Sequence, residues 1–328
     1  MKRIICALLV GAMLLMLCAC GGKKGNSETA SGSYADENTI SIVNSAYEKT
    51  ENTIKDISAI GFELKVTKTV KLGDNSEAQM FKKVYNSLGD GTYFYQSTEK
   101  ADDIDKTLMI YNDNKNIYGY NAETTYLLSK NNNTDEYVGK LGSIISVYNA
   151  SKLKVVDTVI IDASNDGHGF LLEYDFNDQG FDPEAVFGSD MYSEIKDNKD
   201  IKPVGLRVSG IINKDGQLTS QTLTYTYTYE YEEEVTDPTI DPDNSDASNL
   251  ATKVEKKTAT VELVAERSLN YSINKINVPS DITVLPDETQ EGDGENEGDE
   301  DEDEEKITLK ELSISDFLKL KSSDNDEK

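Results

Sequence analysis

The residue types that carry most enzymatic chemistry are scarce in this chain. Among its 328 residues there are three cysteines, one histidine and no tryptophan. All three cysteines lie in the first 20 residues: Cys6, Cys18 and Cys20. The rest of the sequence therefore has no thiol for a disulfide, a catalytic thiolate, a cysteine-ligated zinc ion or an iron–sulfur cluster. Its stability must come from a buried core, which a chain of this length can supply.

A single histidine further restricts the possible sites. His168 lies in the run NDGHG, a turn signal between two strand-like segments. One histidine excludes a multi-histidine metal site and an HExxH motif. A catalytic triad built on this turn residue is the less favoured alternative to a solvent-exposed turn histidine. No glycine-rich phosphate loop and no spacing of paired carboxylates stands out, so we expect neither enzyme activity nor a cofactor.

Positive charge is also in short supply. There are 61 acidic and 33 basic residues, which gives a net charge of −28. Residues 287–305 alone contain 13 Asp or Glu and no Lys or Arg. So acidic a surface repels nucleic acid and anionic lipid headgroups. We therefore expect no nucleic-acid partner and no electrostatic attachment to a membrane.

The N-terminal segment has the pattern of a signal peptide. Lys2 and Arg3 precede an apolar run over residues 4–17. This run is shorter than the roughly 20 residues that a helix needs to cross a bilayer, and it is typical of a signal-peptide core. We predict a lipoprotein signal peptide over residues 1–19. A plain secretory signal or an N-terminal membrane anchor is the alternative.

The end of that segment, LCAC, resembles the lipobox of bacterial lipoproteins. The resemblance implies cleavage before Cys20 and a thioether-linked diacylglycerol on its thiol. Modification of Cys18 is less favoured, because large Leu17 would then occupy a small-residue position. Two or three acyl chains hold a protein firmly on a membrane. The implied location is extracytoplasmic and lipid-anchored at the outer face of the cell membrane, with a Gram-positive-like bacterium favoured.

A tether and an amphipathic helix follow. Residues 20–37, the lipidated cysteine and a stretch rich in Gly, Ser and charge, have the composition of a flexible tether. Spacings of three and four then predict a helix over residues 38–58. Its apolar stripe consists of Ile40, Val43, Tyr47, Thr50, Ile54 and Ile57.

Two shorter helices are expected later in the chain. Residues 134–150 place one apolar face on a helix, formed by Tyr137, Val138, Leu141, Ile144, Ile145 and Tyr148. Asp182 and Pro183 have the residue types of an N-cap and a first helical position. The helix that they begin would carry Phe187, Met191 and Ile195.

Most of the remaining chain alternates apolar and polar residues between short turns, which predicts an antiparallel meander. The expected strands of the first half are 62–70, 80–86, 92–97, 107–111, 117–121 and 124–128. Those of the second half are 154–161, 169–176, 204–212, 217–233, 252–265 and 268–278.

Within the strand 222–231, tyrosines occupy one face and threonines the other. The tyrosines are Tyr225, Tyr227, Tyr229 and Tyr231. They could form a ligand platform, but a cross-strand aromatic ladder that stiffens a hairpin is favoured.

The same hairpin carries an acidic insertion, residues 232–250. Its aspartates are Asp237, Asp241, Asp243 and Asp246. Calcium binding is one interpretation, yet the run lacks the Gly and Glu that an EF-hand loop needs, so a solvated acidic loop is favoured.

Residues 285–328 have the low-complexity, acidic composition of a disordered tail. A short apolar segment, 307–321, is either a partner-docking helix or a segment that lies back on the domain through Leu312, Phe317 and Leu318.

The order of these features resembles the LolA/LppX-like lipoprotein fold over residues 38–284. The shared features are a lipobox, a tether, one N-terminal helix and a long meander interrupted by two short helices, and the ending INVPSDI (276–282) is typical of such domains. The resemblance implies an α+β, mainly β fold: a strongly curved antiparallel half-barrel with the three helices on its concave face. Members carry acyl chains or glycolipids between sheet and helices, sense lipoproteins, or act as structural partners.

Two functions remain open at this point. In the first, the protein binds a lipid or another hydrophobic ligand. The expected lining is Phe62, Leu64, Val66, Tyr93, Tyr95, Leu108, Ile110, Phe170, Leu172 and Tyr174, unless these residues only fill a closed core. In the second, the protein is an adaptor that holds another envelope protein through its edge strands, the loop 232–250 and the tail. An open cavity favours the first function and a filled core favours the second.

Overall fold

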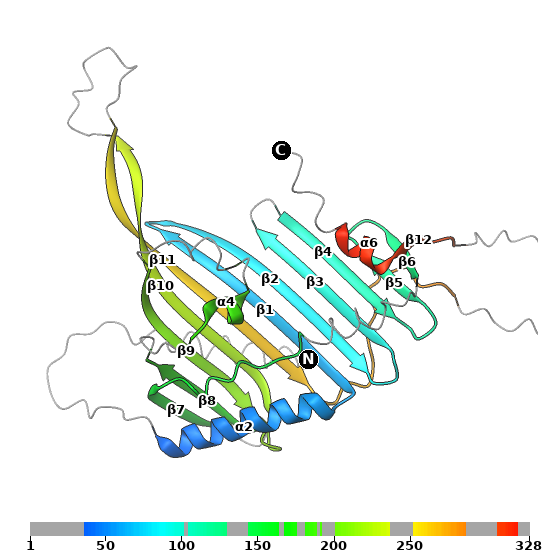
Figure 1. The fold of residues 1–328 in the computed structure, drawn as a ribbon, viewed down its shortest axis with the longest axis horizontal. Coiled ribbons are helices and arrows are strands. Elements are labelled where there is room, and N and C mark those ends of the chain that lie inside the picture. Colours follow the sequence, from blue (N-terminus) through cyan, green and yellow to red (C-terminus); the bar gives the residue numbers. More distant parts are fainter. Residues whose placement is uncertain are drawn as a thin grey trace, which may run out of the picture. The chain divides into compact units, whose positions relative to one another are not determined.

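Among the described residues, twelve strands form one open, curved sheet with three helices, as the computed structural model shows (Figure 1). This confirms the predicted α+β, mainly β class. The structure describes residues 36–101, 104–129, 144–163, 167–175, 181–188, 191, 201–236, 252–286 and 307–320.

The expected N-terminal helix is present as α2 (Glu37–Asp56). Asp36 is its N-cap: its side chain accepts hydrogen bonds from the backbone N–H groups of Asn38 and Thr39, at 3.3 and 3.0 Å. The Thr39 hydroxyl donates to the same carboxylate at 2.6 Å, and these bonds lower the pKa of Asp36. One stripe of the helix is buried: Thr39, Val43, Ala46, Tyr47 and Thr50.

The strands pair largely in chain order. The first half contains β1 (Ala59–Leu72), β2 (Asn75–Leu88), β3 (Tyr93–Ala101), β4 (Ile104–Asn112), β5 (Ile117–Tyr120) and β6 (Thr125–Ser129). The second half contains β7 (Val155–Ala163), β8 (Gly167–Tyr174), β9 (Lys202–Ile212), β10 (Leu218–Thr236) and β11 (Thr252–Asn270). Antiparallel pairing of β1 with β11 joins the two halves into one sheet.

The C-terminal end of this series differs from the prediction. The expected strands 252–265 and 268–278 are one strand, β11, which ends at Asn270. Residues 271–286 form no strand, and Pro279 lacks the N–H that a ladder requires. Ile276 and Ile282 pack instead on one face of β3 to β6, against Phe94, Met109 and Tyr118.

The other face of the sheet carries the helices. Directly opposed residues of an antiparallel pair share a face. The row Val66, Ala265, Leu223 and Val208 therefore defines one face across β1, β11, β10 and β9. This helix face packs against α2 and α4 (Pro183–Phe187). The opposite face carries exposed ion pairs, such as Lys65–Glu266 at 3.0 Å.

The tyrosine row of β10 lies on the helix face, with Tyr225 and Tyr227 buried in its core. The ring centroids of Tyr225 and Tyr227 are 5.5 Å apart along the strand. Their neighbours on β11 are aliphatic, Leu263 and Val261. The predicted cross-strand ladder is therefore wrong, because the rings contact one another along one strand and not across strands.

The two short helices were predicted with mixed success. Helix α4 begins as expected: the Asp182 side chain accepts hydrogen bonds from the N–H groups of Glu184 and Ala185. Phe187 and Met191 are buried, while Ile195 lies outside the described residues.

The prediction of a helix over 134–150 is wrong for its described part, because residues 144–150 are not helical. There the Gln221 side chain pairs with the backbone of Tyr148, accepting from its N–H at 2.9 Å and donating to its carbonyl at 2.8 Å. This tertiary pairing holds the segment extended on β10.

The C-terminal apolar segment lies back on the sheet, which was the second of its two alternatives. Strand β12 (Lys310–Ser313) pairs in parallel with β6, and α6 (Ile314–Lys319) follows it (Figure 1). Phe317 is fully buried on the helix face over Gly119, and its ring lies 5.9 Å from that of Tyr126. The sheet therefore includes a segment that the sequence assigned to the tail.

Candidate functional site

All ten residues expected to line a ligand site lie on the helix face. Register places them there, since Phe62 opposes Tyr85, Tyr85 opposes Tyr95, and Tyr95 opposes Ile110. Leu172 opposes Val208 in the row that defines the same face. Nine of the ten are buried, and Leu64 is half-buried. Among the described residues they fill a core, packed into hydrophobic clusters.

The ten residues divide among three neighbouring clusters. Val66, Phe170, Leu172 and Tyr174 pack with α2 and α4. Tyr93, Tyr95, Leu108 and Ile110 pack with α6. Phe62 and Leu64 lie between these groups, in contact with the end of α2. The structure thus brings the predicted residues to one face, but under different covering elements.

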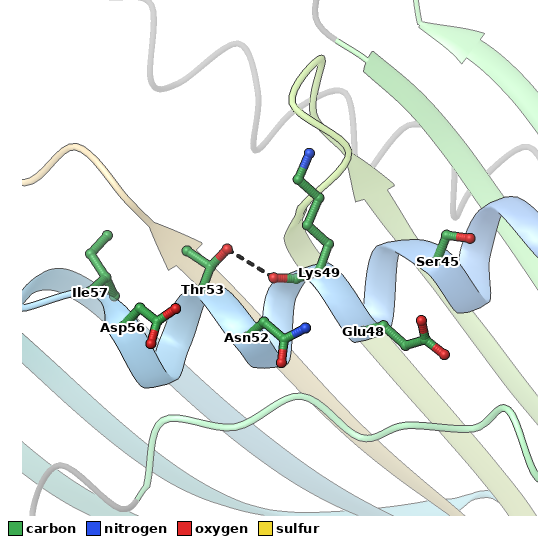
Figure 2. A pocket seen from close by; sticks show the side chains of 7 residues that line it. All are labelled: Ser45, Glu48, Lys49, Asn52, Thr53, Asp56 and Ile57. Atoms are coloured by element: carbon green, nitrogen blue, oxygen red, sulfur yellow. Dashed lines mark hydrogen bonds between the residues drawn. The ribbon is translucent and has the colours of Figure 1, made fainter.

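Two surface depressions lie elsewhere. The larger, about 590 Å³, lies along α2 and its C-cap, as Figure 2 shows. It is lined by Ser45, Glu48, Lys49, Asn52, Thr53, Asp56 and Ile57. The smaller, about 170 Å³, lies beside β6. Polar side chains dominate the larger one, and neither contains any of the ten predicted residues.

A residue that sequence reasoning missed, Arg267 of β11, lies buried on the helix face. Its Nη2 donates to the Val186 carbonyl of α4 at 3.2 Å. Its Nε and Nη1 are buried and have no hydrogen-bond partner among the described residues. Burial lowers the pKa of Arg267 to about 10, and nearby Tyr47 opposes that shift. A lowered pKa means that the surroundings do not compensate the charge.

No carboxylate lies in the row of residues that pair across the sheet through Arg267. From β8 to β4 that row is Phe170, Gly210, Gln221, Arg267, Leu64, Lys83, Ser97 and Leu108. The neighbour on β10, Gln221, already donates its amide to Tyr47 at 3.0 Å and to Tyr148. Arg267 therefore has an apolar neighbour on one side and a fully engaged amide on the other.

Two more cations share the helix face close to this row. Lys83 is in the row itself, with its Nζ 4.9 Å from the Phe81 ring centroid. Lys68 is buried on β1, opposite Leu263. On the opposite face, Lys82 pairs with Glu63 of the neighbouring strand at 3.0 Å. Arg267, Lys83 and Lys68 thus all belong to the helix face.

One of the ten predicted residues, Tyr93, also has a buried polar atom that is not hydrogen-bonded. Its hydroxyl has no hydrogen-bond partner among the described residues. Burial, and to a smaller extent nearby Tyr85, raise the pKa of Tyr93 well above its usual value. The two rings are stacked with their centroids 6.3 Å apart.

The sequence did contain a signal for Arg267. In the run VELVAER, Val261, Leu263 and Ala265 are spaced two apart, with Glu262, Val264 and Glu266 between them, and Arg267 is the next residue of this series. Period-two alternation alone therefore places a cation on the buried face. The prediction treated the strand as ending at 265 and so overlooked this position.

Several predicted sites cannot be placed. Cys20 and the four loop aspartates Asp237, Asp241, Asp243 and Asp246 lie outside the described residues. His168 is exposed, as expected, but it belongs to β8 and not to a turn. Within the described ranges, no three His, Cys, Asp or Glu residues are grouped as metal ligands. In the same ranges no helix is both long and apolar enough to span a membrane.

Comparison with known proteins gives structural likenesses alone. No protein-family model and no curated protein matches the chain. LprF from Mycobacterium bovis has a TM-score of 0.33 at 10% identity, covering 76% of this chain and 100% of that one. A DUF1329 family protein from Desulfovibrio piger scores 0.21 at 9%, covering 73% and 95%.

A third likeness is to a putative outer membrane lipoprotein-sorting protein domain from Vibrio parahaemolyticus. It has a TM-score of 0.21 at 7% identity, with the same coverages of 73% and 95%. All three TM-scores are low, and the functional argument rests on the residues of this chain.

Proposed function

We propose that this protein is a lipid-anchored extracytoplasmic lipoprotein that binds a hydrophobic ligand on the helix face without catalysis. Cys20 would carry the anchor at the outer face of the cell membrane of a Gram-positive-like bacterium. The observation that carries the proposal is that buried polar atoms on the helix face, on Arg267 and Tyr93, have no partner among the described residues. Cores that only stabilise a fold pair nearly all such atoms, and each exception needs an explanation.

Ligand entry requires the filled face to open. Helix α4 covers Arg267 through the Val186 carbonyl; it has five residues and packs on the helix face with Val186 and Phe187. A short helix of this kind contributes little stability by itself, so it can separate from the sheet at modest cost.

Native mass spectrometry of the soluble domain tests the proposal. The protein is prepared from a bacterial host without its signal peptide and with Cys20→Ser. We expect a non-covalent adduct of lipid mass that is released as the collision energy rises. Leu64→Asp on the helix face should abolish the adduct, whereas Lys65→Asp, the next residue on the opposite face, should keep it. Absence of an adduct from both the parent and Lys65→Asp would contradict ligand binding.

The adaptor is the second candidate function: the filled core of the helix face favours it, and so does the edge strand β7. In the described sheet β7 is the terminal strand, and it exposes Val156 and Val159 by 44% and 42%. Exposed apolar side chains on an edge strand favour pairing with a strand of another protein. The acidic loop expected at 232–250 begins later than predicted, because residues 232–236 belong to β10 and pair with β11. In this adaptor function the remaining residues 237–250 and the tail would add further contacts. Crosslinking on intact cells should capture a protein through β7 in the parent and lose it in Val159→Lys.

A further inference from the structure

We infer that the ligand of the helix face is an anionic amphiphile whose carboxylate or phosphate head group binds Arg267 while its apolar chain lies among the predicted residues. This inference rests on the proposed function and specifies the chemistry of its ligand. It starts from the juxtaposition of a buried, incompletely paired guanidinium with an apolar sheet face.

The contacts of Arg267 within the fold do not account for its burial. A guanidinium has five N–H groups. Nη2 donates to the Val186 carbonyl, which leaves three N–H groups on Nε and Nη1 without a partner in the described structure. Burying a charge without enough hydrogen-bond partners makes folding less favourable. Proteins in which apolar side chains replace a buried ion pair are often more stable than the parent. A residue retained at such a cost is typical of a binding site.

The missing partner is expected to be an anion. Charge-assisted hydrogen bonds from a guanidinium to a carboxylate or phosphate are about twice as strong as neutral ones. The protein supplies no carboxylate in that row although its net charge is −28. The position beside Arg267 is therefore left to the charged group of an external anion.

The remainder of the ligand is expected to be apolar. Leu64 on β1 faces Arg267 directly, and Val66 and Ala265 follow along the same face. A small polar anion such as sulfate would gain nothing from these side chains. An acyl chain would bury its methylene groups against them at about 0.8 kcal/mol for each group.

Displacement of the neutral dye Nile red distinguishes the contribution of the head group to binding from that of the apolar chain. The soluble chain is titrated with oleate, with monooleoyl phosphatidate and with oleyl alcohol, all below their critical micelle concentrations. The first two probes test carboxylate and phosphate as sources of the anion, and the alcohol has a similar chain without charge. We expect at least one charged probe to bind at least about tenfold more tightly than the alcohol, as a hydrogen-bonded charge requires.

Arg267→Gln should remove this preference while leaving dye binding and displacement by the alcohol intact. Arg207→Gln is the matched control, because Arg207 is an exposed arginine that pairs with Glu173 on the neighbouring strand. It should keep the preference. Arg267→Gln should also unfold at the same or a higher temperature, which separates loss of an anion site from loss of the fold.

The outcomes are distinguishable. Dye binding with equal displacement by all three probes in the parent would overturn the anion site and leave the hydrophobic site standing. No dye binding would overturn both. A preference that Arg267→Gln retains would also overturn the assignment to Arg267.

Discussion

Phe317→Ala should destabilise the protein, because this side chain fixes the C-terminal segment to the sheet. Phe317 is fully buried, and its ring contacts Tyr126 and covers Gly119. Truncating a buried phenylalanine to alanine costs about 3–5 kcal/mol. With about 2–4 °C for each kcal/mol in a domain of this size, the melting temperature should fall by about 6–20 °C. Circular dichroism during thermal and guanidinium unfolding measures both quantities.

A smaller fall has a defined physical meaning. The segment 307–320 can detach without unfolding the sheet, so its docking free energy limits the loss that the whole domain shows. Amide hydrogen exchange at β12 and α6 distinguishes the two cases, since exchange there must accelerate even if the melting temperature hardly changes. Leu320→Ala is the control: Leu320 is exposed, and its loss should change stability by less than about 0.5 kcal/mol.

Gly119 supplies a double-mutant test of the same contact. A Cβ at Gly119 would lie 2.8 Å from Phe317 Cε2 and Cζ, and 3.0 Å from Leu128 Cδ1. Gly119→Ala should therefore cost about 1–3 kcal/mol through overpacking. In the Phe317→Ala background most of that cost should disappear, giving a coupling of about 1 kcal/mol or more. Additive losses, together with unchanged hydrogen exchange in Phe317→Ala, would refute the docking argument.

Cys20→Ser should remove lipidation, because the thiol is the acceptor; radiolabelled palmitate still appearing on the variant would contradict this. Ile54→Asp should lower stability by several kcal/mol in denaturant unfolding, because a charge would then enter the partly buried contact between α2 and the sheet. An unchanged unfolding midpoint would show that α2 stands away from β1. Alkaline pH should also destabilise the protein. Burial raises the pKa of Tyr47, Tyr93 and Tyr174 above the usual 10, so the stability that they contribute is complete below pH 10 and is lost as pH rises toward their folded-state values. Tyrosinate absorbance at these residues should therefore appear together with unfolding and not before it.

Local signals in the sequence were sufficient for most of the elements. The spacing from Ile40 to Ile57 predicted α2 to within two residues at either end. Asp182 and Pro183 predicted the start of α4. These features were readable because side-chain periodicity and capping depend on residues that are close together in the chain.

The same periodicity placed the ten predicted residues on one face of the sheet without identifying what covers them. Whether such a face forms a cavity or a filled core depends on the helices and loops that pack on it. Phe62 and Leu172 have the same alternation pattern, yet they belong to different clusters. The role of these residues in ligand binding stays a prediction.

Contacts between distant segments were decided by the tertiary structure. The parallel pairing of β12 with β6 brings Leu312 beside Leu128 across a long stretch of chain. Gly119 in the interior of a strand was a signal of close approach by another segment, but it did not say which one. The side chain of Gln221 holds the backbone of Tyr148 extended against the helical pattern of its own neighbours.

Arg267 illustrates both the local sequence signals and the tertiary contacts. The sequence by itself contained the alternation that runs from Ala265 to Arg267 on the apolar side of a strand, because strand side chains alternate with a period of two. The prediction ended the strand at 265 and did not use that alternation. Only the tertiary structure decided that no acidic residue lies across from it on β1 or β10. The reason is that strand alternation is local, whereas the partners of a side chain across a sheet depend on register and on which strands become neighbours.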